Sequence, residues 1–430
     1  MLRLRALLAE AKQQRMALTL RGVIVLLTGV VCGLGLALGS PVWTALSGRA
    51  KATAAPLDPT IESAALVAEV IDRVRREYVD LVDDKRIVEA AIRGIVADLD
   101  QHSTFLDADE YEDIRISTTG AYTGVGIDVN LEGGKVTVVT PLEGAPAERA
   151  GILPGDVVVR VDEIPVDADN VEASVSRMRG APGTAVTLDV LRPGNETPLR
   201  FALTRTEVHV RTVQSEYLGN GLAYVRLSSF AEGTPADLDK AARDLIAAAE
   251  RDDLLGLVLD LRSNPGGLLD AAVRVADTFL ADGVIVSGTG RVRQAQFEQT
   301  AHAGDALEGV PLVVLVNSSS ASASEIVAGA LQDHGRARIV GETTYGKGSV
   351  QTVMPLGEGI AIKLTTSRYL TPSGRSINGS GIEPDVVVRS NDQHRQYRGA
   401  RGRVALRDDA QLLEAIRLIS YDSITLSSIP

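Results

Sequence analysis

The sequence predicts an α/β fold into which a small, mostly β domain is inserted. Residues 254–261 and 311–316 form nearly continuous apolar runs, which are typical of strands buried on both faces of a sheet. Residues 236–250 and 320–331 have the composition and length of helices beside those strands. Residues 116–207 differ, because short alternating runs there are separated by Gly, Pro and Asp, as in a domain of short strands.

Length and composition limit the classes of function. The chain has 430 residues, enough for two or three domains, and 45% of them are hydrophobic. A net charge of −12 with 3% aromatic residues argues against nucleic-acid binding, which needs basic patches and stacking rings. The single cysteine, Cys32, excludes an internal disulfide and a cysteine-based metal site. The five histidines have no ligand-like spacing, so we expect neither a metal nor a cofactor.

The N-terminal segment predicts export. Residues 1–21 carry five Lys and Arg side chains against one Glu, and residues 22–46 carry no charge. About 20 apolar residues span a bilayer as a helix, and basic flanks stay in the cytoplasm. We therefore expect a cytoplasmic lead, a transmembrane helix and a body in the periplasm. A cleaved signal peptide is the alternative, since Ala50-Lys51-Ala52 offers a small-x-small cleavage site.

Two further regions flank the predicted domains. After a linker at 47–59, residues 60–115 form a helical region in which apolar residues recur at helical spacing: Val67, Ile71, Val74 and Tyr78, then Ile87, Ala91, Ile95 and Leu99. The predicted α/β core covers residues 208–390. Residues 391–430 form a C-terminal tail with a last helix at 409–419.

The inserted domain contains a motif for peptide binding. YTGVGI at 122–127, AERAGILPGDVVVRVDEIPV at 147–166 and RGAPGT at 179–184 together resemble a PDZ domain in its permuted bacterial form. In such a domain backbone N–H groups hold a peptide's terminal carboxylate while the peptide adds a strand. The resemblance places this tail-binding loop at Gly124, Val125, Gly126 and Ile127. A nearby cation would strengthen binding of a carboxylate, and Arg179 in the RGAPGT turn is the candidate, with a solvated turn residue as the alternative. A glycine-rich hairpin without a ligand is the alternative.

The serine-rich stretch SSSASASE at 318–325 follows an apolar run, where many hydrolases place a nucleophile. No GxSxG or SxxK motif is present there, so the sequence predicts no nucleophile elbow. His334 is expected at the far end of the helix, out of reach as a base. GETTYGKG at 341–348 nearly matches a phosphate-binding loop, but Gly348 has no hydroxyl for magnesium.

Four motifs together resemble those of the carboxyl-terminal processing peptidases, also called tail-specific proteases. They are SASASEIVAGALQD after Asn317, GETTYGKGSVQ, TTSRYLTPSGRSINGSGIEPD and, upstream, LDLRSNPGGLL. The resemblance implies Ser322 as nucleophile, Lys347 as general base and Gln351 as an assistant to the lysine. It also implies an oxyanion hole, with the N–H of Ala323 as one donor and Gly267, rather than Gly266, as the other.

The chemistry is consistent with these roles. Burial among apolar groups lowers the pKa of a lysine, and a neutral amine can then accept the serine proton. A helix N-terminus at Ser322 favours developing negative charge. We expect less reactive roles for the neighbours: Ser320 caps the helix, Ser324 and Glu325 hydrogen-bond in its first turn, and Asp260 with Arg262 positions the NPGG turn.

The resemblance implies a membrane-anchored serine endopeptidase of the cell envelope that cleaves exported proteins with apolar C-terminal tails. Its core would belong to the crotonase/Clp-like superfamily. The resemblance also implies a homo-oligomer, with the two N-terminal helices and the C-terminal helix as its interface, and an adaptor protein is a further expected partner. Two alternatives are a PDZ scaffold with an inactive peptidase core and a crotonase-like acyl-CoA enzyme. The intact Ser, Lys and Gln argue against the first, and the PDZ domain with export argues against the second.

Overall fold

The computed structural model describes residues 59–249, 254–307, 309–357, 359–389 and 409–427. The predicted basic lead, transmembrane helix and Cys32, with residues 47–58 of the linker and 390–408 of the tail, lie outside these residues. Among the described helices, none combines the length and apolar character needed to cross a membrane. The chain divides into two compact units, residues 1–88 and 89–430.

The predicted N-terminal helices are confirmed. They are α3 (Pro59–Glu77) and α4 (Asp84–Ala97), and the second runs across the boundary between the two units. Within the first unit, Arg75 forms an ion pair with Asp84 at 2.8 Å. Several large apolar side chains on these helices and beside them are exposed, among them Leu66, Val70 and Leu81.

The inserted domain is a small antiparallel sheet with two short helices, as its alternating runs predict. Its strand order is β3-β4-β5-β7-β8, and β6 pairs with β5. The elements are β3 (Ile127–Glu132), β4 (Lys135–Pro141), α6 (Pro146–Ala150), β5 (Val157–Val161), β6 (Ile164–Pro165), α7 (Val171–Met178), β7 (Ala185–Leu191) and β8 (Leu199–Thr204). Val138, Ile152 and Leu188 are among the residues of its own hydrophobic core. The strands β2 (Ala121–Gly124) and β9 (Thr206–His209) pair where the chain enters and leaves this domain.

The predicted apolar runs form the centre of a six-stranded sheet. Its order is β10-β11-β12-β15-β16-β19, antiparallel between the first two strands and parallel thereafter. The strands are β10 (Val213–Gly219), β11 (Leu222–Leu227), β12 (Gly256–Asp260), β15 (Leu312–Val316), β16 (Ala337–Gly341) and β19 (Val386–Val387). All residues of β12 and β15 are buried, as expected of strands covered on both faces.

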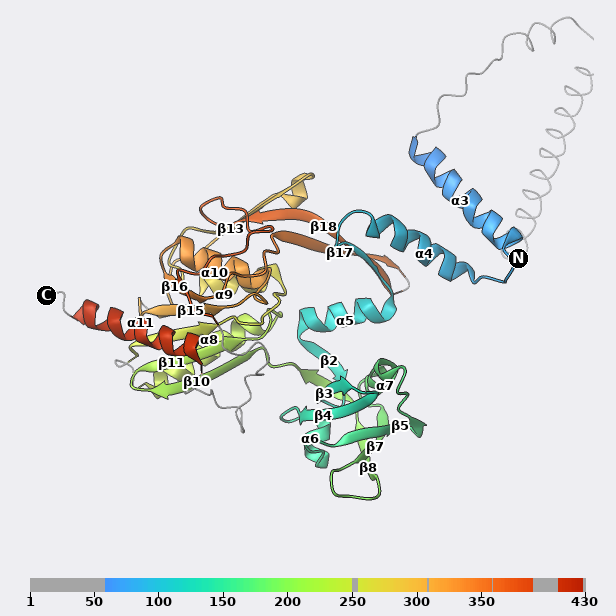
Figure 1. Ribbon diagram of the computed structural model, residues 1–430, viewed down its shortest axis with the longest axis horizontal. Helices are drawn as coiled ribbons and strands as arrows, with labels where there is room; N and C mark the ends of the chain where they lie inside the picture. Colours follow the sequence, from blue (N-terminus) through green and yellow to red (C-terminus); the bar gives the residue numbers. More distant parts are fainter. Residues whose placement is uncertain (1–58, 250–253, 308, 358, 390–408, 428–430) are drawn as a thin grey trace, which may run out of the picture. The chain divides into compact units, whose positions relative to one another are not determined.

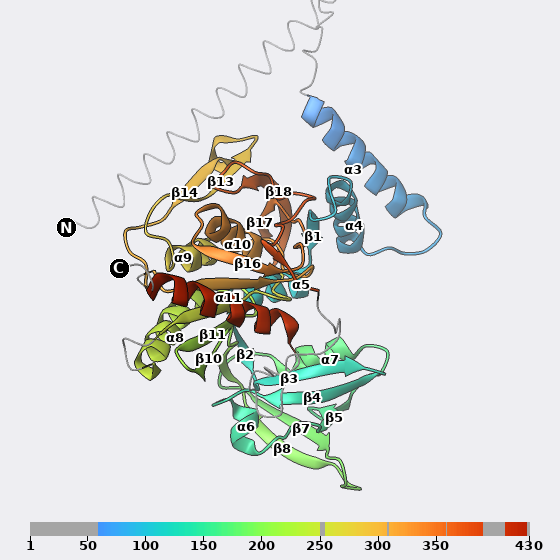
Figure 2. The same cartoon turned by 60° about the vertical axis from the view of Figure 1, so that its left-hand side comes forward.

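Helices cover both faces of this sheet. The helices α8 (Thr234–Ala248), α9 (Leu269–Asp277) and α10 (Ala323–Asp333) contribute to the larger core on one face, where Val314 lies. The helix α11 (Ala410–Ser427) covers the other face, where Leu412 and Ile419 pack near Val313 (Figures 1 and 2). Side chains of successive strand residues point to opposite faces, so each strand serves both cores.

A second, antiparallel sheet has five strands: β1 (Thr104–Leu106), β13 (Val284–Gly290), β14 (Phe297–Thr300), β17 (Ser349–Gly357) and β18 (Ile360–Leu370). The long strand β18 pairs with β1, β13 and β17. The short helix η1 (Arg293–Ala295) precedes β14, and α5 (Ala108–Thr119) follows β1. The hairpin β17–β18 is the longest pair of strands in Figure 1.

Candidate active site

Ser322 lies at the turn that connects β15 with α10. It is the N-cap residue of α10, which begins at Ala323 rather than at Ser320. The prediction that Ser320 caps the helix is therefore wrong. The hydroxyl of Ser320 is buried and donates to the carbonyl of Leu261 at 2.8 Å, so it fastens the turn to the end of β12 instead.

The backbone of Ser322 is strained. Its φ of 56° and ψ of −112° fall in a region that residues with a Cβ rarely adopt, at a cost of about 1–3 kcal/mol. The same kind of strained strand-to-helix turn exposes the nucleophile in hydrolases with a GxSxG motif. The prediction that no nucleophile elbow is present is thus wrong for the backbone conformation, which is that of an elbow, although the GxSxG motif is absent.

One buried carboxylate ties the serine turn to the lysine loop. Glu325 is 0% exposed and accepts the backbone N–H of Ser322 at 2.7 Å and that of Lys347 at 2.9 Å. It also accepts the N–H of Gly346 and the hydroxyl of Thr344, at 2.7 and 2.6 Å. The predicted role of Glu325 in the first helical turn is correct but incomplete, because three of its four donors come from the lysine loop.

Lys347 is half-buried, and its side chain has no ion-pair partner within the described residues. Burial, together with the like charge of Lys363, lowers the pKa of the Lys347 amine, and the charge of Glu325 offsets this in part. A lysine in this environment loses its proton more readily than one in water.

A cavity of about 650 Å³ brings the candidate groups together. Ser322, Ala323, Gly267, Lys347 and Gln351 all line it. No hydrogen bond joins the Ser322 hydroxyl to the Lys347 amine here, and such contacts often tighten only when substrate binds.

Two unpaired N–H groups border this cavity. Within the described residues, neither the N–H of Ala323 nor that of Gly267 donates to a protein acceptor. The N–H of Gly266, in contrast, donates to the side chain of Asn264 at 2.9 Å. This difference favours Gly267 over Gly266 as a donor to an oxyanion. Gly266 instead permits close approach, since a Cβ there would lie 2.8 Å from that of Ser322.

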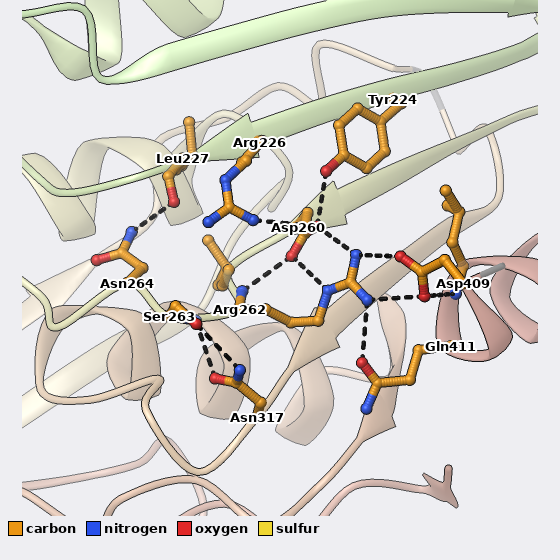
Figure 3. A network of polar contacts seen from close by, with 12 residues as sticks. Tyr224, Arg226, Leu227, Asp260, Arg262, Ser263, Asn264, Asn317, Asp409 and Gln411 are labelled. Carbon is orange, nitrogen blue, oxygen red and sulfur yellow. Dashed lines mark hydrogen bonds and ion pairs between the residues drawn. The ribbon is translucent and has the colours of Figure 1, made fainter. Parts of the chain in front are cut away.

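A buried ionic network surrounds Arg262, two residues before the NPGG turn begins at Asn264 (Figure 3). The Arg262 guanidinium, 1% exposed, donates to Asp260, Asp409 and Gln411 at 2.6–3.0 Å. Asp260 also accepts the hydroxyl of Tyr224 at 2.7 Å. Burial alone would raise the pKa of Asp260, but the Arg262 charge outweighs it and holds that pKa below its ordinary value. The network thus connects the turn at the end of β12 to the start of α11.

Comparison with known proteins agrees with this geometry. Residues 221–388 match the model of peptidase family S41, and residues 123–203 match that of the PDZ domain. The carboxy-terminal-processing protease of Bartonella bacilliformis is 45% identical over 329 residues, 76% of this chain and 76% of that protein. The chain belongs to peptidase family S41.

The chain is thus a serine-type, carboxy-terminal processing protease with a PDZ domain, which confirms the resemblance drawn from its motifs. The carboxy-terminal processing protease CtpB of Bacillus subtilis is 32% identical over 333 residues, 76% of this chain and 68% of that protein. A solved Bacteroides fragilis structure described as an S41 protease has a TM-score of 0.50 at 17% identity, over 82% of this chain and 97% of that one. That last likeness concerns the fold alone.

Gln351 lines the cavity of the protease but forms no hydrogen bond with the lysine. Its side-chain amide donates to the hydroxyls of Ser349 and Thr365, at 2.9 and 3.3 Å. The structure therefore shows no hydrogen bond by which Gln351 would orient Lys347. Ser349 begins β17, as expected of a strand residue.

Tyr369 is a site residue that the sequence reasoning missed. Its buried hydroxyl donates to the carbonyl of Lys347 and lines the cavity with Ser322. Burial raises the pKa of this phenol, and a hydrogen bond with the Ser322 side chain acts in the opposite direction. The only signal in the sequence was its place in the TTSRYLTPSGRSINGSGIEPD motif.

His334 and Ser324 lie at opposite ends of α10 and form hydrogen bonds with other segments of the chain. His334 caps the C-terminal end of α10, as expected, and its ring contacts the carbonyl of Val284 at 2.7 Å. The hydroxyl of Ser324 donates to the carbonyl of Asn264 at 2.9 Å, across to the NPGG turn rather than within its own helical turn.

The PDZ domain of the protease presents its predicted loop at the start of an edge strand. Gly126, with a φ of 74°, precedes β3, which pairs only with β4 among the described strands. Arg179 lies over the ring of Tyr122, 5.9 Å from its centroid, next to this loop. Its guanidinium is engaged by the carboxylate of Asp113 on α5, at 2.5 Å.

Proposed function

We propose that this S41 protease cleaves exported proteins near their C-termini with Ser322 as nucleophile and Lys347 as its base. The observation that carries the proposal is that one cavity is shared by a strained serine, a half-buried lysine and two backbone N–H groups. Among the residues that the structure describes, the lysine has no carboxylate partner and the two N–H groups have no acceptor.

The chemistry follows from these positions. The neutral amine of Lys347 takes the proton from the Ser322 hydroxyl as its oxygen attacks the scissile carbonyl. The N–H groups of Ala323 and Gly267 stabilise the oxyanion, each worth about 3 kcal/mol of barrier. The ammonium then protonates the leaving amine. Water, deprotonated by the same lysine, finally hydrolyses the ester on Ser322.

The experiment is digestion of an unfolded protein by the full chain, followed by mass spectrometry of the fragments. Ser322→Ala and Lys347→Arg should each abolish cleavage, because arginine does not deprotonate in proteins. Ser318→Ala is the matched control, since Ser318 belongs to the same stretch but is exposed. Full activity in either of the first two variants would contradict the dyad.

We infer further that the PDZ domain selects substrates by an apolar C-terminal tail. The tail would add a strand beside β3, and its carboxylate would meet the loop at 124–127 with Arg179 nearby. Asp113 forms an ion pair with Arg179 and would compete with a tail carboxylate for it. Asp113→Asn should therefore strengthen binding of a free-acid peptide more than that of its amidated counterpart. Equal effects on the two peptides would place carboxylate recognition elsewhere.

We propose an envelope location on the basis of the N-terminal segment. The five cationic residues before the uncharged stretch predict a cytoplasmic lead, a membrane anchor and a body in the periplasm. A reporter that is active only outside the cytoplasm, fused after Pro430, should be active. An inactive reporter on a folded fusion would contradict this orientation.

We also propose that the protease forms a homo-oligomer through its N-terminal helices. Large apolar side chains on α3 and α4 and between them are exposed, including Leu66 at 63%, Val70 at 53% and Leu81 at 104%. Such exposure is typical of a surface that another chain covers. Light scattering of the full chain in detergent should give a mass above that of one chain and detergent, and Leu66→Glu with Val70→Glu should lower it. A partner such as an adaptor protein would instead appear as a second species in complexes isolated from cells.

A further inference from the structure

A second lysine lies in the catalytic cavity. Lys363 is on β18, in register with Val353 on β17 and Thr104 on β1, and it lines the same cavity as Ser322 and Lys347. Its side chain is half-buried. The mechanism above gives it no role.

The ammonium of Lys363 has no partner among the described residues. No carboxylate lies within ion-pair distance of it there, and no described acceptor takes a hydrogen bond from it. Arg115, which also borders the cavity, differs, because its guanidinium is held by Glu112 in two hydrogen bonds of 2.6 and 2.7 Å.

The other titratable and charged groups around the two lysines come from several elements. They are His102 before β1, Arg115 and Tyr111 on α5, Asp270 on α9, Glu325 on α10 and Tyr369 on β18. The charge of Glu325 raises the pKa of the Lys347 amine and so opposes the effect of Lys363. The two carboxylate oxygens of Glu325 already accept hydrogen bonds from four donors. His102 responds to the same field, since burial and then the charge of Lys347 lower the pKa of its ring.

We propose that Lys363 is a positioning residue that acts through charge: its ammonium, in the same cavity as the Lys347 amine, favours the neutral form of that amine. Two cations in one partly desolvated cavity repel each other, and this repulsion favours the state in which one of them has lost its proton. The direction of the pKa shift at Lys347 agrees, because the charge of Lys363 adds to the effect of burial. The inference rests on the proposed role of Lys347 as the base.

The test is the pH dependence of kcat/KM in a series at position 363. The substrate is a short peptide without ionisable side chains and with both ends blocked, so that any direct attraction between substrate and Lys363 is removed. Lys363→Arg keeps the charge and should retain the wild-type profile. Lys363→Met should move the acid limb to higher pH, and Lys363→Glu should move it further. Below the limb, the active fraction falls about tenfold for each pH unit, so a displaced limb is measurable at neutral pH.

The value of kcat/KM on the high-pH plateau distinguishes an electrostatic role of Lys363 from a structural one. If Lys363 acts through charge, Lys363→Met recovers most of its activity at high pH, and added salt moves the wild-type limb towards that of the variant. An unchanged limb with a lower plateau in Lys363→Met would overturn the proposal, as would a Lys363→Arg limb displaced as far as that of Lys363→Met. Both outcomes leave the dyad intact, provided that Lys347→Arg is inactive at every pH. Unfolding midpoints of the three variants show whether a lower plateau reflects misfolding.

Discussion

The Glu325 carboxylate accepts the backbone N–H of Lys347 at 2.9 Å, and the same oxygen accepts that of Ser322 at 2.7 Å. The proposed nucleophile and the proposed base come from loops that are 25 positions apart in the sequence, and this carboxylate holds their backbones together. The relative position of Ser322 and Lys347 therefore depends on a residue to which the proposed mechanism gives no part in proton transfer.

Glu325→Gln tests this positioning role. A glutamine places an NH₂ group against donors, so at least one hydrogen bond is lost, at a cost of about 1–3 kcal/mol. We expect kcat to fall at least about tenfold, which corresponds to about 1.4 kcal/mol. Because the charge of Glu325 raises the pKa of Lys347, its removal should also move the acid limb of the pH profile to lower pH. A lower plateau without this displacement would mean that the charge of Glu325 does not reach the lysine.

The strain at Ser322 predicts that the fold tolerates glycine better than alanine at this position. Glycine adopts a positive φ without the steric cost that other residues have, so Ser322→Gly should raise the free energy of unfolding by about 1 kcal/mol over Ser322→Ala. Both variants should be inactive. Urea unfolding of the two variants, compared with each other, gives the difference; a less stable glycine variant would show that the turn is not strained.

Lys347→Met should stabilise the fold while it abolishes activity. The pKa of Lys347 in the folded protein lies below its ordinary value of 10.5, so the unfolded chain binds more protons between these two values. The resulting destabilisation is full below the folded pKa and disappears as the pH rises towards 10.5. We expect the variant to have the higher melting temperature at pH 7 and the advantage to shrink by pH 10. The same advantage at both pH values would attribute it to packing rather than to charge.

Removal of Arg262 should destabilise the core strongly. Arg262→Met removes the guanidinium that pairs with the buried carboxylate of Asp260 and leaves the hydroxyl of Tyr224, the charge of Arg226 and the backbone N–H of residue 262 near it. Breaking such a pair costs about 3–5 kcal/mol. The double change Asp260→Asn with Arg262→Met should recover part of the loss. The pKa of Asp260 is below its ordinary value of 3.8. The stability that its ionised carboxylate contributes to the fold is therefore present above about pH 4 and is lost on acidification. A single variant as stable as the wild type would show that the network is not needed for folding.

The sequence predicted the elements better than the contacts between them. The apolar runs of β12 and β15 and the periodicity of α3 and α4 are local signals, and the structure has strands and helices where these signals occur. Only the motifs pointed to Ser322 and Lys347, because neither composition nor periodicity selects one serine among five. The structure brings both to one cavity.

The missed features depend on residues that are distant in the sequence. Ser320 looks like a helix cap because serine often is one, but its partner is Leu261, 59 positions earlier. Likewise, the contact of Arg179 with Asp113 spans 66 positions. Local patterns carry no information on such pairs, since they form only when separate elements pack together.

The most direct test of the central claim is to locate the acyl group after the full chain is mixed with a blocked peptide p-nitrophenyl ester at pH 8 and quenched with acid during the first turnover. Digestion and tandem mass spectrometry should place the ester on Ser322 in the wild type, and no ester should form in Lys347→Arg. An acyl group on another residue, or acylation of Ser322 at the wild-type rate in Lys347→Arg, would contradict the Ser322–Lys347 dyad.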